Sequence, residues 1–274
     1  VFYNMTMKQS ATAPEAANKN SFVPNKALGQ NFLTDERVIC TILDASGCTG
    51  KTVLEIGPGT GALTQGLLER AIRLYAVEKD GRLCELLAER FGERLTLLHA
   101  DFLEADIGSL VQESTWHAVG NLPYYATTPI VLKLLSLLPE SMTLMVQKEA
   151  AERFFAEPGD RVYGPLAVMT QCFYSAKKVL SVPRSCFTPS PEVDSTIVRL
   201  ERNSMQEQNP AAFLAFLKQA FSMRRKTLYN SLMRDPRLPD ALQACQISLD
   251  ARAEALEADS LLRLYRRLEA MGRA

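Results

Sequence analysis

Short apolar runs alternate with amphipathic stretches from residue 52 onwards. Five of these runs have the length and composition of buried strands, at residues 52–56, 74–77, 95–98, 117–120 and 143–146. Leucines between them recur at helical spacing, which predicts helices over residues 62–70, over residues 83–91 and from Pro129 to about Leu138. Such an alternation predicts an α/β fold, a parallel sheet covered by helices on both faces.

The pattern changes in the last third of the chain. Two further strands are predicted at residues 179–182 and 195–200, joined by a proline-rich loop. A polar stretch from Asn203 to Asn209 then marks a boundary. Beyond it only helices are predicted, over residues 211–223, 227–234, 239–245 and 260–271. The pattern divides the chain into a loose tail (1–24), an α/β domain (25–203) and a small all-helical domain (204–274).

Composition narrows the class of protein. Of the 274 residues 47% are apolar, and 31 basic residues balance 31 acidic ones, so net charge favours no particular partner. Lys133, Pro139 and Glu140 interrupt the most apolar stretch, and the tail lacks the apolar centre of a secretory signal. The six cysteines form no C-x-x-C pair and there are two histidines. We therefore expect a reduced, cytoplasmic protein without a membrane span or metal site.

Polar residues stand at or just after the ends of four predicted strands. These positions are Glu55, followed by Gly57, at the first end, and then Glu78, Asp101 and Asn121. In open parallel sheets, ligands bind outside the carboxyl ends of the strands. The coincidence at four separate strand ends therefore predicts one shared binding site.

The first of these ends carries the glycine-rich turn Glu55-Ile-Gly-Pro-Gly-Thr-Gly61. Glycines allow the backbone to approach a ligand, and the carboxylate of Glu78 at the end of the next strand can accept ribose hydroxyls. These features suit S-adenosylmethionine or a dinucleotide, and G-x-G-x-G spacing favours the former over the G-x-G-x-x-G of dehydrogenases. Asp101 either accepts a hydrogen bond from the adenine amine of such a cofactor or caps a helix.

The segment Asn121-Leu122-Pro123-Tyr124 follows the fourth strand. The Asn121 side-chain oxygen and the Leu122 carbonyl can each accept a hydrogen from an adenine amine, which turns the nitrogen lone pair toward a methyl donor. Pro123 fixes the turn and Tyr124 can stack on the base. The alternative is an ordinary turn with a packed tyrosine, and the position after a parallel strand favours the catalytic interpretation.

For two further features, a functional role and a purely structural role are about equally consistent with the sequence. Phe187, in the proline-rich loop, either clamps the other face of a base rotated out of its stack or packs in the core. Arg224, Arg225 and Lys226 either bind phosphates or form a solvated helix end.

Several stretches, in this order, resemble the ribosomal RNA adenine dimethyltransferases. They include Gly29-Gln-Asn-Phe-Leu33, the glycine-rich turn, Glu78-Lys-Asp80, Gly120-Asn-Leu-Pro-Tyr124, Phe187-Thr-Pro-Ser-Pro-Glu-Val-Asp-Ser195 and Arg224-Arg-Lys-Thr-Leu228. The resemblance implies a Rossmann-like S-adenosylmethionine-dependent methyltransferase domain followed by a helical domain that binds RNA or the ribosome. It also implies that Asn31 and Leu33 join the cofactor-binding positions.

The resemblance further implies a reaction. Family members place two methyl groups on N6 of each of two adjacent adenosines, in the 3′-terminal hairpin loop of 16S rRNA within the small (30S) subunit, late in its assembly. Nothing in the sequence requires more than a monomer. Two alternatives stay open: a ribosome-assembly factor whose methylation is incidental, and a large-subunit methylase, against which Leu122 in place of isoleucine argues.

Overall fold

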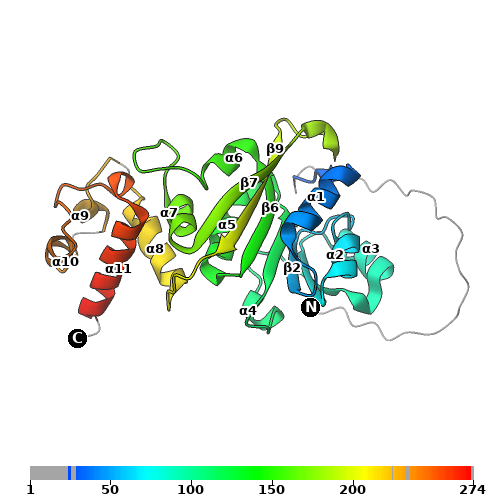
Figure 1. The fold of residues 1–274 in the computed structure, drawn as a ribbon, viewed down its shortest axis with the longest axis horizontal. Helices are drawn as coiled ribbons and strands as arrows, with labels where there is room; N and C mark the ends of the chain where they lie inside the picture. The colour runs from blue at the N-terminus through cyan, green and yellow to red at the C-terminus, as the bar shows by residue number, and fades with distance from the viewer. Residues whose placement is uncertain (1–23, 26–28, 224, 233–234, 273–274) are drawn as a thin grey trace, which may run out of the picture.

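A computed structural model describes residues 24–25, 29–223, 225–232 and 235–272 (Figure 1). The tail expected over residues 1–24 lies outside the described residues except for Pro24. The strands are β1 (Phe32–Leu33), β2 (Thr52–Ile56), β3 (Arg73–Glu78), β4 (Thr96–His99), β5 (His117–Asn121), β6 (Ser141–Gln147), β7 (Tyr174–Val182), β8 (Phe187–Thr188) and β9 (Ser195–Arg202). All seven strands expected from the sequence are therefore present.

The α-helices alternate with these strands and then follow them. They are α1 (Glu36–Ser46), α2 (Thr64–Arg70), α3 (Gly81–Phe91), α4 (Ile107–Leu110), α5 (Thr127–Leu137), α6 (Lys148–Glu152), α7 (Pro165–Phe173), α8 (Pro210–Ala220), α9 (Leu228–Ser231), α10 (Leu238–Ala244) and α11 (Ala258–Gly272). Short 3₁₀ turns occupy Gly92–Arg94, Tyr124–Ala126, Arg184–Cys186 and Ala253–Ala255.

Seven strands form one sheet in the order β4-β3-β2-β5-β6-β9-β7. The first five strands of this order are parallel, and β9 runs antiparallel to both of its neighbours. The chain moves outward from β2 through β3 to β4, then returns to the other side of β2 to form β5. The order of strands thus reverses between β2 and β5, which is where such sheets bind ligands.

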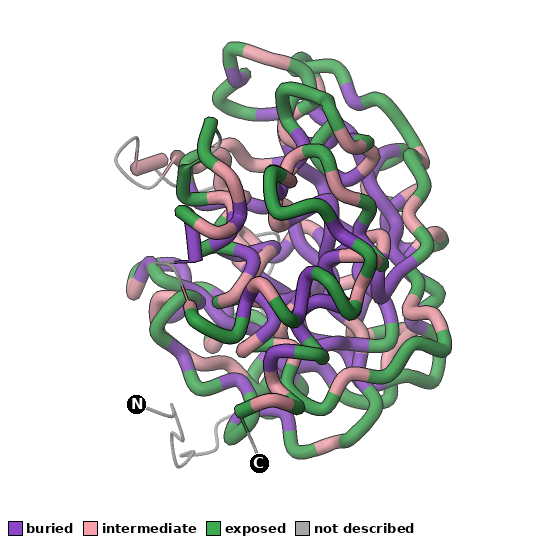
Figure 2. The backbone as a smooth tube through the Cα atoms, turned by 90° about the vertical axis from the view of Figure 1, so that its left-hand side faces the viewer, coloured by how far each residue is buried: buried purple, intermediate pink, exposed green. Residues whose placement is uncertain are grey.

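The two faces of the sheet are buried under different helices. Alternate residues of each strand point to opposite faces, so Leu54 and Ile56 pack with α5 and α7 on one face. Val53, which precedes Leu54, packs with α1, α2 and α3 on the other. The result is a three-layer sandwich whose buried stretches run through the interior while exposed stretches lie at the periphery (Figure 2).

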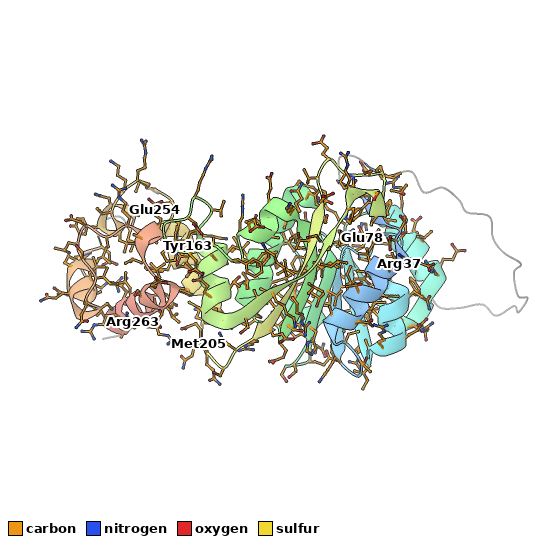
Figure 3. All side chains as sticks on the ribbon, turned by 45° about the horizontal axis from the view of Figure 1, so that its top comes forward. Arg37, Glu78, Tyr163, Met205, Glu254 and Arg263 are labelled. Atoms are coloured by element: carbon orange, nitrogen blue, oxygen red, sulfur yellow. The ribbon has the colours of Figure 1, made fainter. Side chains whose placement is uncertain are left out.

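The C-terminal helices are joined to this sandwich by a shared core. Phe213 of α8 and Tyr265 of α11 belong to the same buried cluster as the inner residues of α7. Tyr163, labelled in Figure 3, donates a hydrogen bond from its hydroxyl to the Leu256 carbonyl (2.9 Å). A separate apolar cluster unites α9 and α10 with Leu264 and Leu268, on another face of α11. Helices α8 and α11 therefore each serve two cores.

No helix in the described part of the chain is long and apolar enough to cross a bilayer. All six cysteines are free thiols. Among the residues that the structure describes, no three His, Cys, Asp or Glu side chains gather in a way that could hold a metal ion.

Candidate active site

The carboxyl ends of four adjacent strands meet at one cavity. Its lining includes every position expected to bind a cofactor: Asn31, Leu33, Gly57, Glu78, Asp101 and Asn121. Leu122, Pro123 and Tyr124 also line it. The cavity lies where the strand order reverses between β2 and β5, so parallel-sheet geometry explains why these residues come together.

The glycine-rich turn keeps the space beside β2 open. Gly57, Gly59 and Gly61 have φ angles of 65°, 59° and 87°, in the left-handed region that favours glycine. A Cβ atom on Gly59 would lie 3.2 Å from the Phe32 ring, and one on Gly61 would lie 2.8 Å from the Phe91 ring. The turn can therefore lie against both rings only because it carries no side chains there.

The carboxylate of Glu78 joins this turn to the end of β3. One of its oxygens, Oε2, accepts a hydrogen bond from the Gly59 amide (3.1 Å), and Oε1 accepts from the amides of Lys79 (2.8 Å) and Asp80 (2.9 Å). Burial raises the pKa of Glu78, while these amides oppose the shift. Three N–H groups thus fix the carboxylate at the cavity wall, with acceptor capacity left on Oε2.

Asp101 faces the cavity after β4. Its Oδ2 forms an ion pair with Lys79 Nζ (2.8 Å), and its Oδ1 accepts from the Leu103 amide (2.9 Å). The hydrogen bond from Lys79 holds the pKa of Asp101 below its usual range. Asp106, not Asp101, is the N-cap of α4. Asp101 instead stabilises the turn that it begins, which fixes the direction of its carboxylate. Because its pKa is lowered, that carboxylate is ionised and accepts hydrogen bonds.

Asn121 is held by the chain segment that crosses the cavity, residues 29–33, which we name the strap. The Asn121 Nδ2 group donates to the Asn31 carbonyl (3.1 Å), although the two residues lie 90 positions apart. The strap itself is anchored by pairing of β1 with β8 and by Gln30 Nε2, which donates to Asp80 Oδ2 (2.9 Å). Since Nδ2 is bound to the strap, Oδ1 is the carboxamide atom that remains to accept.

The residues after Asn121 form a rigid turn. The Leu122 amide donates to the Met145 carbonyl of β6 (3.0 Å), and the Leu122 side chain is buried. Pro123 has an extended backbone and precedes the 3₁₀ turn Tyr124–Ala126. The Tyr124 hydroxyl lies 2.7 Å from Ser195 Oγ at the start of β9. This bond fixes the tyrosine ring at the cavity.

The sequence leaves Phe187 open between a base clamp and a core residue, and its position is that of a core residue. Its side chain is 3% exposed and belongs to the apolar core beneath α1 and α2. It lies in β8, pairs with Leu33 of the strap and is absent from the cavity lining. Its aromatic side chain supports the strap from behind.

Two residues of the basic triplet, Arg225 and Lys226, lie apart from the cavity. Both are exposed just before α9, and Arg224 lies outside the described residues. In Figure 1 the helices α9 to α11 occupy one end of the molecule and β2 lies toward the other, and Figure 3 labels Arg263 of α11 and Glu78 toward these two ends. The structure therefore shows two exposed basic side chains on the helical end of the protein.

Some cavity residues were not singled out from the sequence. Phe32 and Phe102 line the cavity, as does Tyr125, which is 59% exposed at its rim. Phe32 lies inside the Gly29-Gln-Asn-Phe-Leu33 stretch, so that motif was the available signal. Phe102 and Tyr125 each adjoin an expected site residue, and adjacency alone does not show which way a side chain points.

The fold and the cavity together define a class of protein. The sheet has seven strands, of which one is antiparallel to the others. A glycine-rich turn follows its first long strand, and an acidic residue ends the next strand. These features are typical of an S-adenosylmethionine-dependent methyltransferase. A family model described as ribosomal RNA adenine dimethylase matches residues 21–270, and the chain belongs to that family.

Individual relatives agree with this assignment. A Bacillus licheniformis protein named ribosomal RNA small subunit methyltransferase A is 38% identical, over 93% of this chain and 94% of its own. A Clostridium perfringens protein of the same name is 42% identical over 83% of both. Among solved structures, a dimethyladenosine transferase from Plasmodium falciparum has a TM-score of 0.71 at 28% identity, covering 88% of this chain and 98% of that one. The structure of the 23S rRNA methyltransferase ErmE has a TM-score of 0.61 at 30% identity, and the match covers 87% of this chain and 100% of that one.

Proposed function

We propose that this protein transfers methyl groups from S-adenosylmethionine to N6 of two adjacent adenosines in the 3′-terminal hairpin loop of 16S rRNA, late in small-subunit assembly. The proposal is supported by relatives named as small-subunit methyltransferases at 38–42% identity. The relative named as a 23S rRNA enzyme has 30% identity. The observation that carries the chemistry is the anchored carboxamide of Asn121 at the cavity.

The residues at the strand ends fit the methyl donor. Glu78 offers a fixed carboxylate to the ribose hydroxyls, the glycine-rich turn leaves room for the chain of the donor, and Asp101 offers an acceptor to the adenine amine. Asn31 and Leu33 cover the donor from the strap. When bound, S-adenosylmethionine supplies a methyl group on a positively charged sulfur.

Asn121 and Leu122 act on the target adenosine. The lone pair of an adenine amine is delocalised into the ring, so the amine is a weak nucleophile. The Asn121 Oδ1 atom and the Leu122 carbonyl would accept hydrogen bonds from its two N–H groups and favour a tetrahedral nitrogen with a free lone pair. As the bond from nitrogen to the methyl carbon forms, the bond from sulfur to that carbon would break, and the nitrogen would release one proton to water. This is catalysis by orientation and by fixed dipoles rather than by a strong base.

Tyr124 holds the ring of the target base. Its hydroxyl is fixed to Ser195, which leaves the face of the aromatic ring for stacking at the cavity. An adenosine must leave its base stack to reach this position, and stacking on an aromatic side chain compensates part of that cost. Pro123 sets the direction in which Tyr124 leaves β5.

The helical end of the protein supplies the larger contact with the substrate. Arg224, Arg225 and Lys226 bind phosphates of the RNA in this proposal, supported by the exposure of the last two. We place the domain boundary at residues 203/204, although α8 and α11 share a core with α7. In this proposal the protein acts as a monomer on 30S particles in the cytoplasm.

The direct test is incubation of the protein with radiolabelled S-adenosylmethionine and 30S particles that lack the modification, followed by nucleoside analysis. N6,N6-dimethyladenosine at two adjacent positions of 16S rRNA is expected. The same incubation is carried out in parallel with particles of the large subunit. Labelling confined to 23S rRNA would replace this proposal with the large-subunit alternative, and labelling of neither would overturn both.

A further inference from the structure

Lys133 of α5 has an unusual set of hydrogen bonds outside the cavity. Its ammonium donates to three backbone carbonyls: Phe102 (2.7 Å), Leu103 (3.0 Å) and Ala105 (2.6 Å). An ammonium has three N–H donors, so these three acceptors use all of them. The ammonium also lies 5.3 Å from the centroid of the Phe102 ring.

These carbonyls belong to a single helical turn. The amides of Glu104 and Ala105 both donate to the Asp101 carbonyl (3.0 and 2.9 Å), which closes one turn starting at Asp101. One isolated turn is too short to be stable alone, because forming it fixes several dihedral angles for few hydrogen bonds. A cation at the carboxyl end of such a turn satisfies its free carbonyls and favours its dipole. Lys133 therefore holds the turn in place.

The turn carries the acceptor that faces the base of the methyl donor. Asp101, Phe102 and Leu103 all line the cavity, whereas Lys133 lies outside it and lines a neighbouring surface groove with Leu132 and Lys218. The Lys133 ammonium contacts this turn and does not line the cavity. Any effect of this lysine on a bound ligand must therefore be indirect.

The charges around the turn are consistent with this role. Burial lowers the pKa of Lys133, while the carboxylates of Asp101 and Asp106 oppose that shift. On the cavity side, Lys79 forms its ion pair with Asp101. Asp101 is thus set between a lysine that binds its carboxylate directly and a lysine that fixes the backbone behind it.

We propose that Lys133 is a positioning residue for recognition of the methyl donor: by fixing residues 101–105, it sets the direction of the Asp101 carboxylate and so the preference of the cavity for adenine. This inference rests on the proposed binding of the donor with its adenine amine at Asp101. A carboxylate accepts hydrogen bonds but cannot donate them. It favours adenine, which has an amine at C6, over hypoxanthine, which has a carbonyl there.

The experiment measures binding of two nucleosides without RNA. S-adenosylhomocysteine and S-inosylhomocysteine differ at C6, an amine against a carbonyl, and at the adjoining N1, which carries a hydrogen only in the inosine compound. Calorimetry gives a dissociation constant for each. Lys133→Met removes the three donors while keeping the length of the side chain. We expect it to reduce the preference for the adenine compound by about tenfold or more, the effect of losing one hydrogen bond to a charged group. Lys133→Arg should retain more of the preference.

Three comparisons separate positioning from general stability. Lys178→Met is the control, since Lys178 also lies over an aromatic ring (Phe155, 5.1 Å to the centroid) but binds the Glu152 carboxylate (2.8 Å) instead of backbone carbonyls, and neither of those residues lines the cavity. It should leave the preference unchanged. In an Asp101→Ala background, Lys133→Met should change the preference little, because no carboxylate remains to be positioned. Thermal unfolding of each variant shows how much stability is lost.

The proposal is overturned if Lys133→Met lowers the melting temperature but keeps the wild-type preference, or if it weakens both compounds equally. It is also overturned if the only change is a higher KM for 30S particles, since Lys133 would then contact RNA. Failure of the proposed function gives a different result, in which wild type binds S-adenosylhomocysteine with the expected preference yet methylates no 16S rRNA.

Discussion

The two ends of the central sheet both carry polar side chains, but only one end forms the active-site cavity. At the amino ends of β5 and β6, the buried Arg199 donates to the Ser46 carbonyl and to Thr143 Oγ1, both at 2.9 Å, and His117 Nδ1 lies 2.7 Å from Ser141 Oγ. These groups join neighbouring strands and α1. At the carboxyl ends, Glu78 and Asn121 are held instead by backbone groups of loops.

The difference shows what makes a row of polar residues a site. Side chains that bond one another across strands use their donors and acceptors in stabilising the fold. Side chains held from behind by loop amides and carbonyls keep oxygens that face a ligand. Glycines at the carboxyl end leave the space for that ligand. We therefore expect substitutions at the carboxyl ends to alter reaction and binding, and those at the amino ends to alter stability.

Asn121→Ala should give the largest effect. It removes the oxygen that accepts from the target amine, so turnover should fall by about a hundred- to a thousandfold, as for loss of one fixed donor or acceptor at a transition state. Binding of S-adenosylhomocysteine should change far less. Single-turnover methylation of 30S particles measures the first quantity and calorimetry the second. Thr143→Val, which removes a polar partner at the amino end, is the control and should keep wild-type turnover.

Tyr124→Ala should lower turnover by about ten- to a hundredfold, because stacking of one base on an aromatic ring contributes roughly 1–3 kcal/mol. Tyr124→Phe keeps the ring but loses the bond to Ser195, so its defect should be smaller. The same methylation assay compares the three proteins. Equal loss of turnover and donor affinity in Tyr124→Ala would indicate a local folding defect rather than loss of stacking.

Arg199→Met should leave turnover intact and reduce the free energy of unfolding by about 1.5–3 kcal/mol, the cost of losing hydrogen bonds to a charged group. The loss follows from the freed Ser46 carbonyl and Thr143 hydroxyl, both of which are buried. Urea denaturation measures it. A large fall in turnover with unchanged stability would contradict the division between the two ends.

The stability of the two ends should respond to pH in opposite directions. Burial raises the pKa of Glu55, a cavity-lining carboxyl bonded to Thr64, to about 8. The folded state therefore keeps a proton that an exposed glutamate loses near pH 4.3, and the free energy of unfolding should fall as the pH rises from about 4.5 to 8. Glu55→Gln should flatten this slope in urea denaturation series, whereas Glu69→Gln on the exposed face of α2 should not.

His117 should give the reverse dependence. Burial lowers its pKa, with the charge of Arg199 adding to the shift. The folded state thus favours the neutral ring, and the free energy of unfolding should fall as the pH drops below about 6.5, the ordinary pKa of histidine. Substituting His117→Gln removes the titrating group and should abolish this acid-side loss. If the variant still lost the same free energy of unfolding at low pH, groups other than His117 would be responsible for that loss.

The sequence predicts the carboxyl end of the sheet well because its signals are local. Residues 52–56 and 117–120 are apolar runs with sharp polar ends, and the structure places strands at both. Once parallel strands are recognised, their carboxyl ends must meet, so Gly57, Glu78, Asp101 and Asn121 could be grouped without coordinates. The assignment of Asp106 rather than Asp101 as the cap of α4 required the structure.

Other elements lack such signals or have ambiguous ones. Helix α7 is buried almost throughout, so it has no polar face and no helical period to detect. Helix α1 is absent from the predicted elements although Asp35 and Gly47 cap its two ends. The contact of Asn31 with Asn121 and that of Lys133 with residues 102–105 join distant parts of the chain. Spacing along the sequence contains no information on either, and Phe187 shows that a suitable residue type can serve the core instead.

The bond between the Asn31 carbonyl and the Asn121 carboxamide joins the strap to a residue at the strand end. Each donor molecule carries one methyl group, so a dimethylated adenosine requires spent donor to leave and fresh donor to enter. Movement of residues 29–33 for that exchange would release Asn121 at the same moment. We therefore expect the half-modified adenosine to dissociate between rounds, so that free monomethylated particles accumulate early in a time course.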